Sequence, residues 1–293
     1  MRIEDPAGRD RTAGAVRIER VHDASLIRDV YARHPLVHPY GLADVRLFWH
    51  RSVWWRDARC PQAVVGVLDL PGSPIPVVYA ISAAVEDPTR ALLSQLARAG
   101  TLGPRFVVTG PRRLTASLAP THRAAWARDH VKLACTRVDL LPAPDARVRP
   151  IGHDDLEQLH RLFDTDPSAG DFFHAGLLDD GWYRGIEAEH GTLLSVAGTH
   201  VVDAVSGVAA LGNVATHPDA RRRGLGRATV ATLTRELLAA GLQVGLNVAV
   251  DNLGARALYE QLGFAWVLDY QEAELVALRA PGPPPDVTAA ALP

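Results

Sequence analysis

The sequence is poor in cysteine, in lysine and in long apolar runs. Its two cysteines, Cys60 and Cys135, lie far apart and form neither a CxxC pair nor a cysteine–histidine spacing, so they predict neither a disulfide framework nor a zinc site. No apolar run approaches the roughly 20 residues that span a bilayer, and the N-terminus lacks the apolar core of a signal peptide. We therefore expect a cytoplasmic protein with no metal ion and no membrane partner.

An excess of charge of one sign is absent as well. The 31 basic and 33 acidic residues leave a formal net charge of -2, which gives no general reason to bind nucleic acid. Lys132 is the only lysine, and together with the heavy use of alanine, proline and glycine this is typical of a GC-rich genome, so we assign it no role in mechanism. Positive charge must therefore act locally if it acts at all.

The length of 293 residues is about twice that of a typical domain of roughly 150 residues, so we expect two domains. Three prolines interrupt the pattern between 141 and 150 and mark the boundary. We predict an N-terminal domain over 16–141, a linker over 142–150 and a second domain over 146–279. Residues 1–15 and 280–293 are rich in glycine, proline and alanine without apolar periodicity, so we expect both ends to be disordered.

Apolar periodicity and turn residues predict alternating strands and helices. In the first half, the pattern predicts strands within 63–70, 75–82, 106–110 and 130–141, and a helix over 88–100. In the second half it predicts, in order, a strand at 146–150, a helix at 152–164, an irregular stretch or short helix at 167–186, strands at 192–203 and 206–218, a helix at 225–240, a strand at 243–251, a helix opened by Asn252 and a last strand at 264–275. This order predicts the α/β (α+β) class, with a mixed twisted sheet and flanking helices.

A stretch rich in glycine and arginine at 217–229, HPDARRRGLGRAT, leads into the helix predicted from about Leu225. The first turn of a helix has unpaired backbone N–H groups and carries partial positive charge from the helix dipole. Glycines there let an anion approach the backbone closely, and arginines supply donors and charge around it. The residues concerned are Gly224, Gly226, Arg222, Arg223 and Arg227. This arrangement fits a pyrophosphate better than a single carboxylate.

Other interpretations of these glycines must be weighed. A P-loop requires GxxxxGK[ST], and the second half of the chain has no lysine. A dinucleotide-binding turn requires GxGxxG directly after a strand, whereas Thr229 stands in the third glycine position and a loop separates the glycines from the strand. A solvated run of charge beside a helix start is the remaining alternative. A GxG alone favours that alternative, so the phosphate site depends on what accompanies it.

Two sequence motifs accompany the glycines. The first is R-x-x-G-x-G between a strand and a helix, and the second is N-x-x-A-x-x-x-Y-x-x-x-G-F. Their residues are Arg221, Gly224 and Gly226 in the first, and Asn252, Ala255, Tyr259, Gly263 and Phe264 in the second. In this order and spacing they resemble the GNAT superfamily of N-acetyltransferases, over about residues 146 to 275.

The resemblance implies the GNAT acyl-CoA N-acyltransferase fold, in which acetyl-CoA lies in a wedge between two splayed parallel strands. It implies that the pyrophosphate binds the amides at 222–227 and that the pantetheine arm pairs with a strand edge, as a peptide would. An N–H group of that strand would polarise the thioester oxygen. The implied acetyl-CoA contacts are Val214, Ala215, Thr216, Arg221, Arg222, Arg223, Gly224, Leu225, Gly226, Arg227 and Asn252, with no metal ion.

Acyl transfer from a thioester to an amine needs a neutral amine, stabilisation of an oxyanion and a proton for the thiolate. Tyr259 is the candidate proton donor, because it lies seven residues beyond Asn252, nearly two helical turns on and on the same face. The helix alone favours a core tyrosine, whereas the resemblance favours the acid. Asn252 is a helix cap, a cofactor contact or both.

The general base is left unassigned. Related enzymes that acetylate ribosomal-protein N-termini tend to carry a glutamate on the strand before Asn252, and the matching residue here is Asn247, which cannot act as a base. The other candidates, each more typical of a structural role, are His174, His200, Asp203, Glu272 and Glu274. An amine that deprotonates easily would need no dedicated base.

The first half has the strand and helix rhythm of a similar fold but lacks both motifs. We interpret it as a degenerate GNAT-like domain, so that the chain resembles tandem GNAT proteins. We predict an acetyl-CoA-dependent N-acetyltransferase that acts in a ternary complex on the amine of a small molecule or peptide, as a monomer or homodimer. The alternatives are a catalytically silent CoA-binding or sensor module and a tandem enzyme of the mycothiol-synthase type.

Overall fold

The computed structural model describes residues 16–71, 73–81, 85–170, 172–189 and 191–278, and the ends predicted to be disordered lie outside them. The strands are β1 (Ile18–Val21), β2 (Ser52–Asp57), β3 (Cys60–Leu68), β4 (Val77–Tyr79), β5 (Arg105–Gly110), β6 (His122–Cys135), β7 (Arg149–Pro150), β8 (Arg184–Glu187), β9 (Leu193–Asp203), β10 (Val208–Thr216), β11 (Gln243–Ala249) and β12 (Phe264–Ala277). The α-helices are α1 (Ala24–Tyr31), α2 (Pro39–Leu47), α3 (Glu86–Arg98), α4 (Arg112–Ala116), α5 (Leu156–Asp164), α6 (Leu225–Ala239) and α7 (Leu253–Gln261). Short 3-10 helices are η1 (Trp49–Arg51), η2 (Val138–Leu140), η3 (His153–Asp155), η4 (Pro167–Gly170), η5 (Ala175–Leu178) and η6 (Pro218–Ala220).

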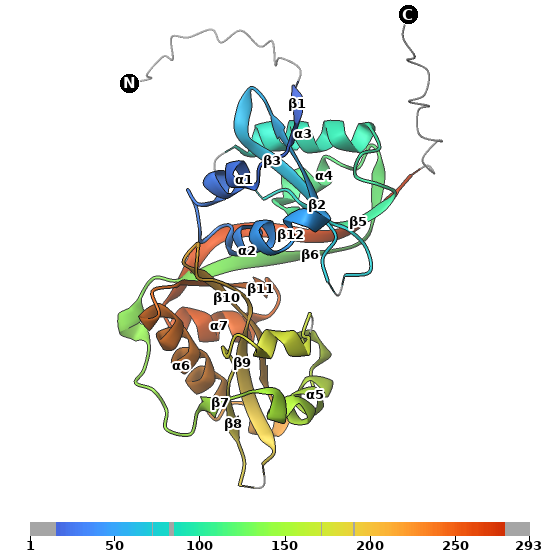
Figure 1. The fold of residues 1–293 in the computed structure, drawn as a ribbon. Helices are drawn as coiled ribbons and strands as arrows, with labels where there is room; N and C mark the ends of the chain where they lie inside the picture. The colour runs from blue at the N-terminus through green and yellow to red at the C-terminus, as the bar shows by residue number, and fades with distance from the viewer. Residues whose placement is uncertain (1–15, 72, 82–84, 171, 190, 279–293) are drawn as a thin grey trace, which may run out of the picture.

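The strands form one sheet in the order β1-β2-β3-β4-β5-β12-β6-β11-β10-β9-β8-β7 (Figure 1). Each half of the chain follows one pattern, with three antiparallel pairings, then a parallel pairing of its fourth and fifth strands. The strand beside each fifth strand comes from the other half, because β12 pairs with β5 and β6 pairs with β11. β6 and β12 also pair with each other. The two halves therefore share a continuous sheet and exchange a strand at its centre.

Helices cover both faces of the second half of the sheet. On one face, Val230, Leu233 and Leu237 of α6 are spaced three and four residues apart and pack with Leu246 of β11 and with Tyr259 of α7. The other face is covered by α5 and by α2 of the first half, which packs against β9 and β10. We call this second face, covered by α2 and α5, the α2/α5 face. An element of the first half thus lies directly over strands of the second.

The predicted helices at 88–100, 152–164 and 225–240 and the helix opened by Asn252 are confirmed as α3, α5, α6 and α7. Three predictions about strands differ from the structure. β6 begins at His122, well before residue 130, because the exposed residues 123–128 show no apolar alternation and are held by pairing with β12. β8 lies within the stretch predicted to be irregular or a short helix. The predicted strand at 146–150 is reduced to β7, and residues 141–148 have no helix or strand.

Candidate functional site

The parallel strands β10 and β11 part within the second half of the sheet. Their last paired residues are Leu211 and Leu246. Beyond this position, which we call the splay point, β11 continues beside β6, whereas residues 212–216 of β10 pair only with β9 in the part of the chain that the structure describes. One edge of β10 is therefore free to pair with an extended ligand, as the resemblance implied for Val214, Ala215 and Thr216.

A β-bulge interrupts β10 at the splay point. The register with β9 shifts between Gly212 and Ala215, and Asn213 has a positive φ of 49°. The side chain of Asn213 is fixed from both ends, because its Oδ1 accepts a hydrogen bond from the Tyr183 hydroxyl at 2.8 Å and its Nδ2 donates to the Ala169 carbonyl at 3.0 Å. Bulges re-aim backbone groups next to functional sites, and this one leaves Val214 outside the ladder.

The chain turns tightly between the free end of β10 and the start of α6. Gly224 is the N-cap of α6 and has a φ of 77°, and Arg222 also lies in the left-handed region, with a φ of 58°. A Cβ atom added to Gly226 would lie 3.0 Å from Thr216 Oγ1, so the first turn of α6 packs closely against the end of β10. Only a residue without a side chain fits here without displacing its neighbour.

The start of α6 has positive charge and no acidic residue in its first turn. The side chains of Arg222, Arg223 and Arg227 are exposed, and the ion pairs found among the described residues include none of them. The first N–H groups of a helix also have no partner within it. The arrangement can bind an anion through amides and guanidinium groups together.

Arg221, the signature arginine, lies differently from its neighbours. Its Nε donates to the Thr216 carbonyl at 3.2 Å and its guanidinium pairs with Asp166, also at 3.2 Å. Its backbone N–H donates to the Pro218 carbonyl. These contacts hold the loop against the end of β10. Arg221 therefore stabilises the loop, while the next arginines remain available to bind an anion.

Tyr259 lies on α7, on the face opposite α2, in the core cluster that includes Leu246 at the splay point. The helix begins at the N-cap Asn252, whose Oδ1 accepts a hydrogen bond from the Ala255 amide at 3.1 Å, and this confirms the predicted cap. Tyr259 is buried, packs against Phe264 and has its pKa raised to about 12 because burial disfavours the phenolate. It also contributes to the raised pKa of Tyr40, after burial and nearby carboxylates, which brings the two phenols within electrostatic reach of each other.

The α2/α5 face at the splay point carries a group of polar side chains, of which the sequence had pointed to His200 and Asn247 but not to Tyr40 or Lys132. The Tyr40 hydroxyl, from α2, lies 3.4 Å from His200 Nδ1, and the His200 ring lies against Gly212, where an added Cβ would be 2.2 Å from it. Next to Tyr40, Lys132 Nζ donates to Asn247 Oδ1 at 2.8 Å. The only sign of Lys132 in the sequence was a single lysine within the apolar run VKLAC, and we attributed the scarcity of lysine to a GC-rich genome.

The candidate bases are distributed unevenly around the splay point. His200 lies beside it, and the Glu272 carboxylate accepts a hydrogen bond from the Tyr270 hydroxyl at 3.2 Å. Asp203 is buried and paired with Arg46 at 2.9 Å. Glu274 pairs with Arg105 at 2.7 Å, where β12 lies beside β5 in the first half, and His174 is an exposed N-cap of η5. The structure therefore brings two of the five, His200 and Glu272, near the Tyr40 group.

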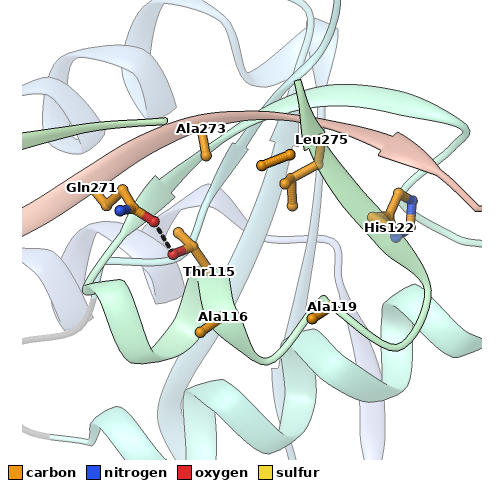
Figure 2. Close-up of a pocket in the computed structure, with 8 residues that line it drawn as sticks. Thr115, Ala116, Ala119, His122, Gln271, Ala273 and Leu275 are labelled. Atoms are coloured by element: carbon orange, nitrogen blue, oxygen red, sulfur yellow. Dashed lines mark hydrogen bonds between the residues drawn. The ribbon is translucent and has the colours of Figure 1, made fainter. Parts of the chain in front are cut away.

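One pocket is lined by residues from both halves of the chain. Figure 2 shows it between α4 and the strands β6 and β12, lined mainly by small apolar side chains such as Ala116, Ala119 and Ala273. Its volume is about 140 Å³, below the roughly 300 Å³ at which ligand pockets usually begin. It contains none of the predicted site residues.

Two further properties concern the described residues as a whole. They contain no group of three or more histidine, cysteine, aspartate or glutamate side chains arranged to hold a metal ion. None of their helices combines the length and the apolar character needed to cross a bilayer.

Comparison with known proteins agrees with this geometry. Residues 152–264 match the model of the acetyltransferase (GNAT) family, and no curated protein matches the chain. Similar solved structures include a Drosophila protein (17% identity, 90% of this chain and 99% of that one, TM-score 0.64) and a GCN5-related N-acetyltransferase from Sphaerobacter thermophilus (17%, 90% and 96%, 0.60). A tandem GNAT protein from the clavulanic acid biosynthesis pathway is also similar (13%, 91% and 100%, 0.54). At these identities the likeness concerns the fold, and it extends over both halves. The chain thus has the GNAT fold, and its second half is a domain of the GNAT acetyltransferase family.

Proposed function

We propose that residues 146–279 form an acetyl-CoA-dependent N-acetyltransferase, which transfers the acetyl group directly to the amine of a small molecule or peptide in a ternary complex. The observation that carries the proposal is the free edge of β10 beyond Leu211, which leads into the arginine-rich start of α6. A strand edge and a helix N-terminus in sequence fit the two parts of the donor, an amide-containing arm and a pyrophosphate.

In this proposal the pyrophosphate binds the amides at 222–227, with the exposed arginines around it. Arg221 contributes by holding the loop through Thr216 and Asp166 rather than by contacting phosphate. The pantetheine arm pairs with β10 at Val214, Ala215 and Thr216. The full set of donor contacts also includes Arg222, Arg223, Gly224, Leu225, Gly226, Arg227 and Asn252.

The reacting centre combines groups from both faces of the sheet. The Val214 amide, next to the bulge, polarises the thioester oxygen. Tyr259 donates the proton that the departing thiolate needs, and its raised pKa keeps the phenol protonated through the neutral range. The acceptor approaches from the α2/α5 face, where Tyr40 and His200 lie.

We further propose that residues 16–141 are a degenerate GNAT-like domain joined by a linker at 142–150. Its strand order repeats that of the second half, which supports a common origin for both. It helps to form the acceptor side of the site, because α2 packs on β9 and β10.

Calorimetric titration with acetyl-CoA, followed by an assay of free-thiol release over a panel of primary amines, tests this function. We expect one acetyl-CoA to bind per chain and at least one amine to be acetylated, with turnover reduced in Tyr259→Phe. Binding without turnover on any amine would instead support a silent CoA-binding module. The absence of binding would exclude both functions.

A further inference from the structure

Lys132 lies on the α2/α5 face at the splay point. Its backbone pairs with Asn247, the first residue of β11 beyond the last partner of β10. Its Nζ donates to Asn247 Oδ1 at 2.8 Å, and its exposed fraction is only 1%. Asn247 is partly exposed and links this nitrogen to the opening between the strands. The chain has therefore placed its only lysine beside the gap proposed to hold the thioester.

The groups that face Lys132 come from four elements. The aromatic rings of Tyr40 on α2 and Tyr270 on β12 lie with their centroids 5.1 and 5.4 Å from Nζ. His200 of β9 contacts Tyr40, and Asn247 of β11 accepts the hydrogen bond. The remaining titratable neighbours that act on this nitrogen or respond to it are Glu272 and His38. No carboxylate forms an ion pair with Nζ within the described ranges.

Burial without a paired carboxylate disfavours the charged form of an amine. Desolvation lowers the pKa of Lys132 to about 7, and Glu272 opposes this only in part. Lysines of this kind carry out proton transfer in proteins because a neutral amine is available near neutral pH. The same nitrogen in an exposed lysine would be charged almost entirely.

We propose that Lys132 is the general base of this site and takes a proton from the ammonium of the acceptor, directly or through one water molecule. The inference rests on the proposed N-acetyltransferase function. The acceptor R–NH₃⁺ gives one proton to the neutral Nζ, and R–NH₂ attacks the thioester carbon. A C–N bond forms and the C–S bond breaks. The thiolate takes the Tyr259 proton, the second proton of the nitrogen restores Tyr259, and Lys132 releases its proton to solvent.

This role also gives the first half of the chain a part in the reaction. Lys132 belongs to β6 and Tyr40 to α2, and both elements come from the first half. The exchange of strands brings β6 against β11, so the base reaches the second half only because the sheet is shared. The acceptor it suits is a basic aliphatic amine, which is charged at neutral pH and must lose a proton before it attacks.

Because Lys132 is the only lysine, its titration can be followed without ambiguity. Protein labelled with ¹³Cε-lysine should give one lysine resonance. We expect it to titrate near neutral pH and to shift when acetyl-CoA is added. A resonance that titrates in the ordinary lysine range, or that does not respond to bound acetyl-CoA, would overturn the proposal whether or not an acceptor has been found.

Three variants separate a base from a structural donor. Lys132→Gln keeps a hydrogen-bond donor for Asn247, Lys132→Arg keeps the charge, and Lys132→Met keeps the length without a polar group. We expect each to lower kcat/KM for an aliphatic amine by about 100-fold at pH 7 and to remove the rise of kcat/KM with pH that follows the neutral form of Lys132. Arg98→Met, at an exposed site on α3, is the control and should behave as the wild type.

An aromatic amine as acceptor sharpens the test, because it is neutral at pH 7 and needs no base. Its acetylation should be nearly equal in wild type and in the three variants. If the wild type acetylates amines but Lys132→Gln or Lys132→Arg retains full activity and the wild-type pH profile, the lysine is structural and this inference fails alone. Failure of acetyl-CoA to bind the wild type would refute the proposed function itself.

Discussion

The two parallel strand pairs of the sheet, β4–β5 and β10–β11, end differently although they occupy matching places in their halves. β4 and β5 remain paired through Tyr79 and Thr109, and the Ala80 amide adds a hydrogen bond to the Thr109 carbonyl at 2.9 Å. Gly110 is so close that an added Cβ would lie 3.1 Å from the Ala80 carbonyl oxygen. β10 instead continues over 212–216 without β11. The strand order alone therefore does not part the two parallel strands. Whether they part depends on how far one strand runs beyond the last residue of its partner that pairs with it.

The helices that follow the first strand of each pair, α3 after β4 and α6 after β10, differ in the charge of their first turns. α3 begins with Glu86 and Asp87 in its first turn, so its own carboxylates already interact with the positive end of the helix dipole. α6 has no acidic residue there and begins at Gly224 beside exposed arginines. An incoming pyrophosphate would be repelled at α3 and attracted at α6. In the proposed function, one fold thus carries a donor site in the second half, whereas the helix start in the first half is neutralised by its own carboxylates.

The largest effect is expected from disrupting the close contact between α6 and the free end of β10, where the second half differs from the first. Gly226→Val places a branched side chain against Thr216, which lies 3.0 Å from the position of the new Cβ. We expect acetyl-CoA affinity to fall by more than about 1,000-fold, or 4 kcal/mol, in a calorimetric titration. Gly152→Val is the control, because Gly152 has an extended backbone and open space around it. Wild-type affinity in Gly226→Val with an unchanged melting temperature would contradict the proposed site.

The next effect is expected from removing the hydroxyl group of Tyr259, the proposed proton donor. The shorter helix α4 has no tyrosine in the matching place. Tyr259→Phe should lower kcat by about 100-fold, because the thiolate loses its acid, while acetyl-CoA affinity changes little. Tyr31→Phe is a matched control in the first half, since the buried Tyr31 hydroxyl has no hydrogen-bond partner within the described residues. Steady-state thiol release and calorimetry measure the two quantities. Equal turnover in Tyr259→Phe and wild type would remove Tyr259 from the mechanism.

The sequence predicted the parts of this comparison that are local. The helix ends, the cap at Asn252 and the turn with two glycines follow from neighbouring residues and short-range hydrogen bonds. Arg221 was expected to contact acetyl-CoA as the next arginines do, yet its guanidinium pairs with Asp166, a contact across 55 positions that no local pattern encodes.

The exchange of β6 and β12 was not predicted, because it depends on pairing between segments more than a hundred residues apart, such as Trp126 and Glu274. The position of Lys132 beside Asn247 follows from the same exchange. A buried lysine and a surface lysine look alike in sequence unless their long-range partners are known. For this reason the α2/α5 face of the candidate site was its least predictable part.

A smaller effect is expected from the arginines that distinguish α6 from α3. Arg222→Gln, Arg223→Gln and Arg227→Gln should each weaken acetyl-CoA binding by about 3- to 10-fold at low salt, because an exposed charged contact contributes about 1 kcal/mol and is screened by ions. Calorimetric titrations at low and high salt measure this difference. Arg98→Gln, on the surface of α3, is the control. An effect that persists unchanged at high salt would indicate a role other than charge.

The smallest effect is expected from removing the acidic start of α3. In the double variant Glu86→Gln, Asp87→Asn the first half still lacks a parted strand pair, so calorimetry should again give one acetyl-CoA per chain. The free energy of unfolding should fall by less than about 2 kcal/mol, since each carboxylate near a helix N-terminus contributes about 0.3–1 kcal/mol, and Asp87 also loses its exposed ion pair with Arg90. A second molecule of acetyl-CoA bound to this variant would show that charge at α3, rather than the closed strands β4 and β5, keeps the donor out of the first half.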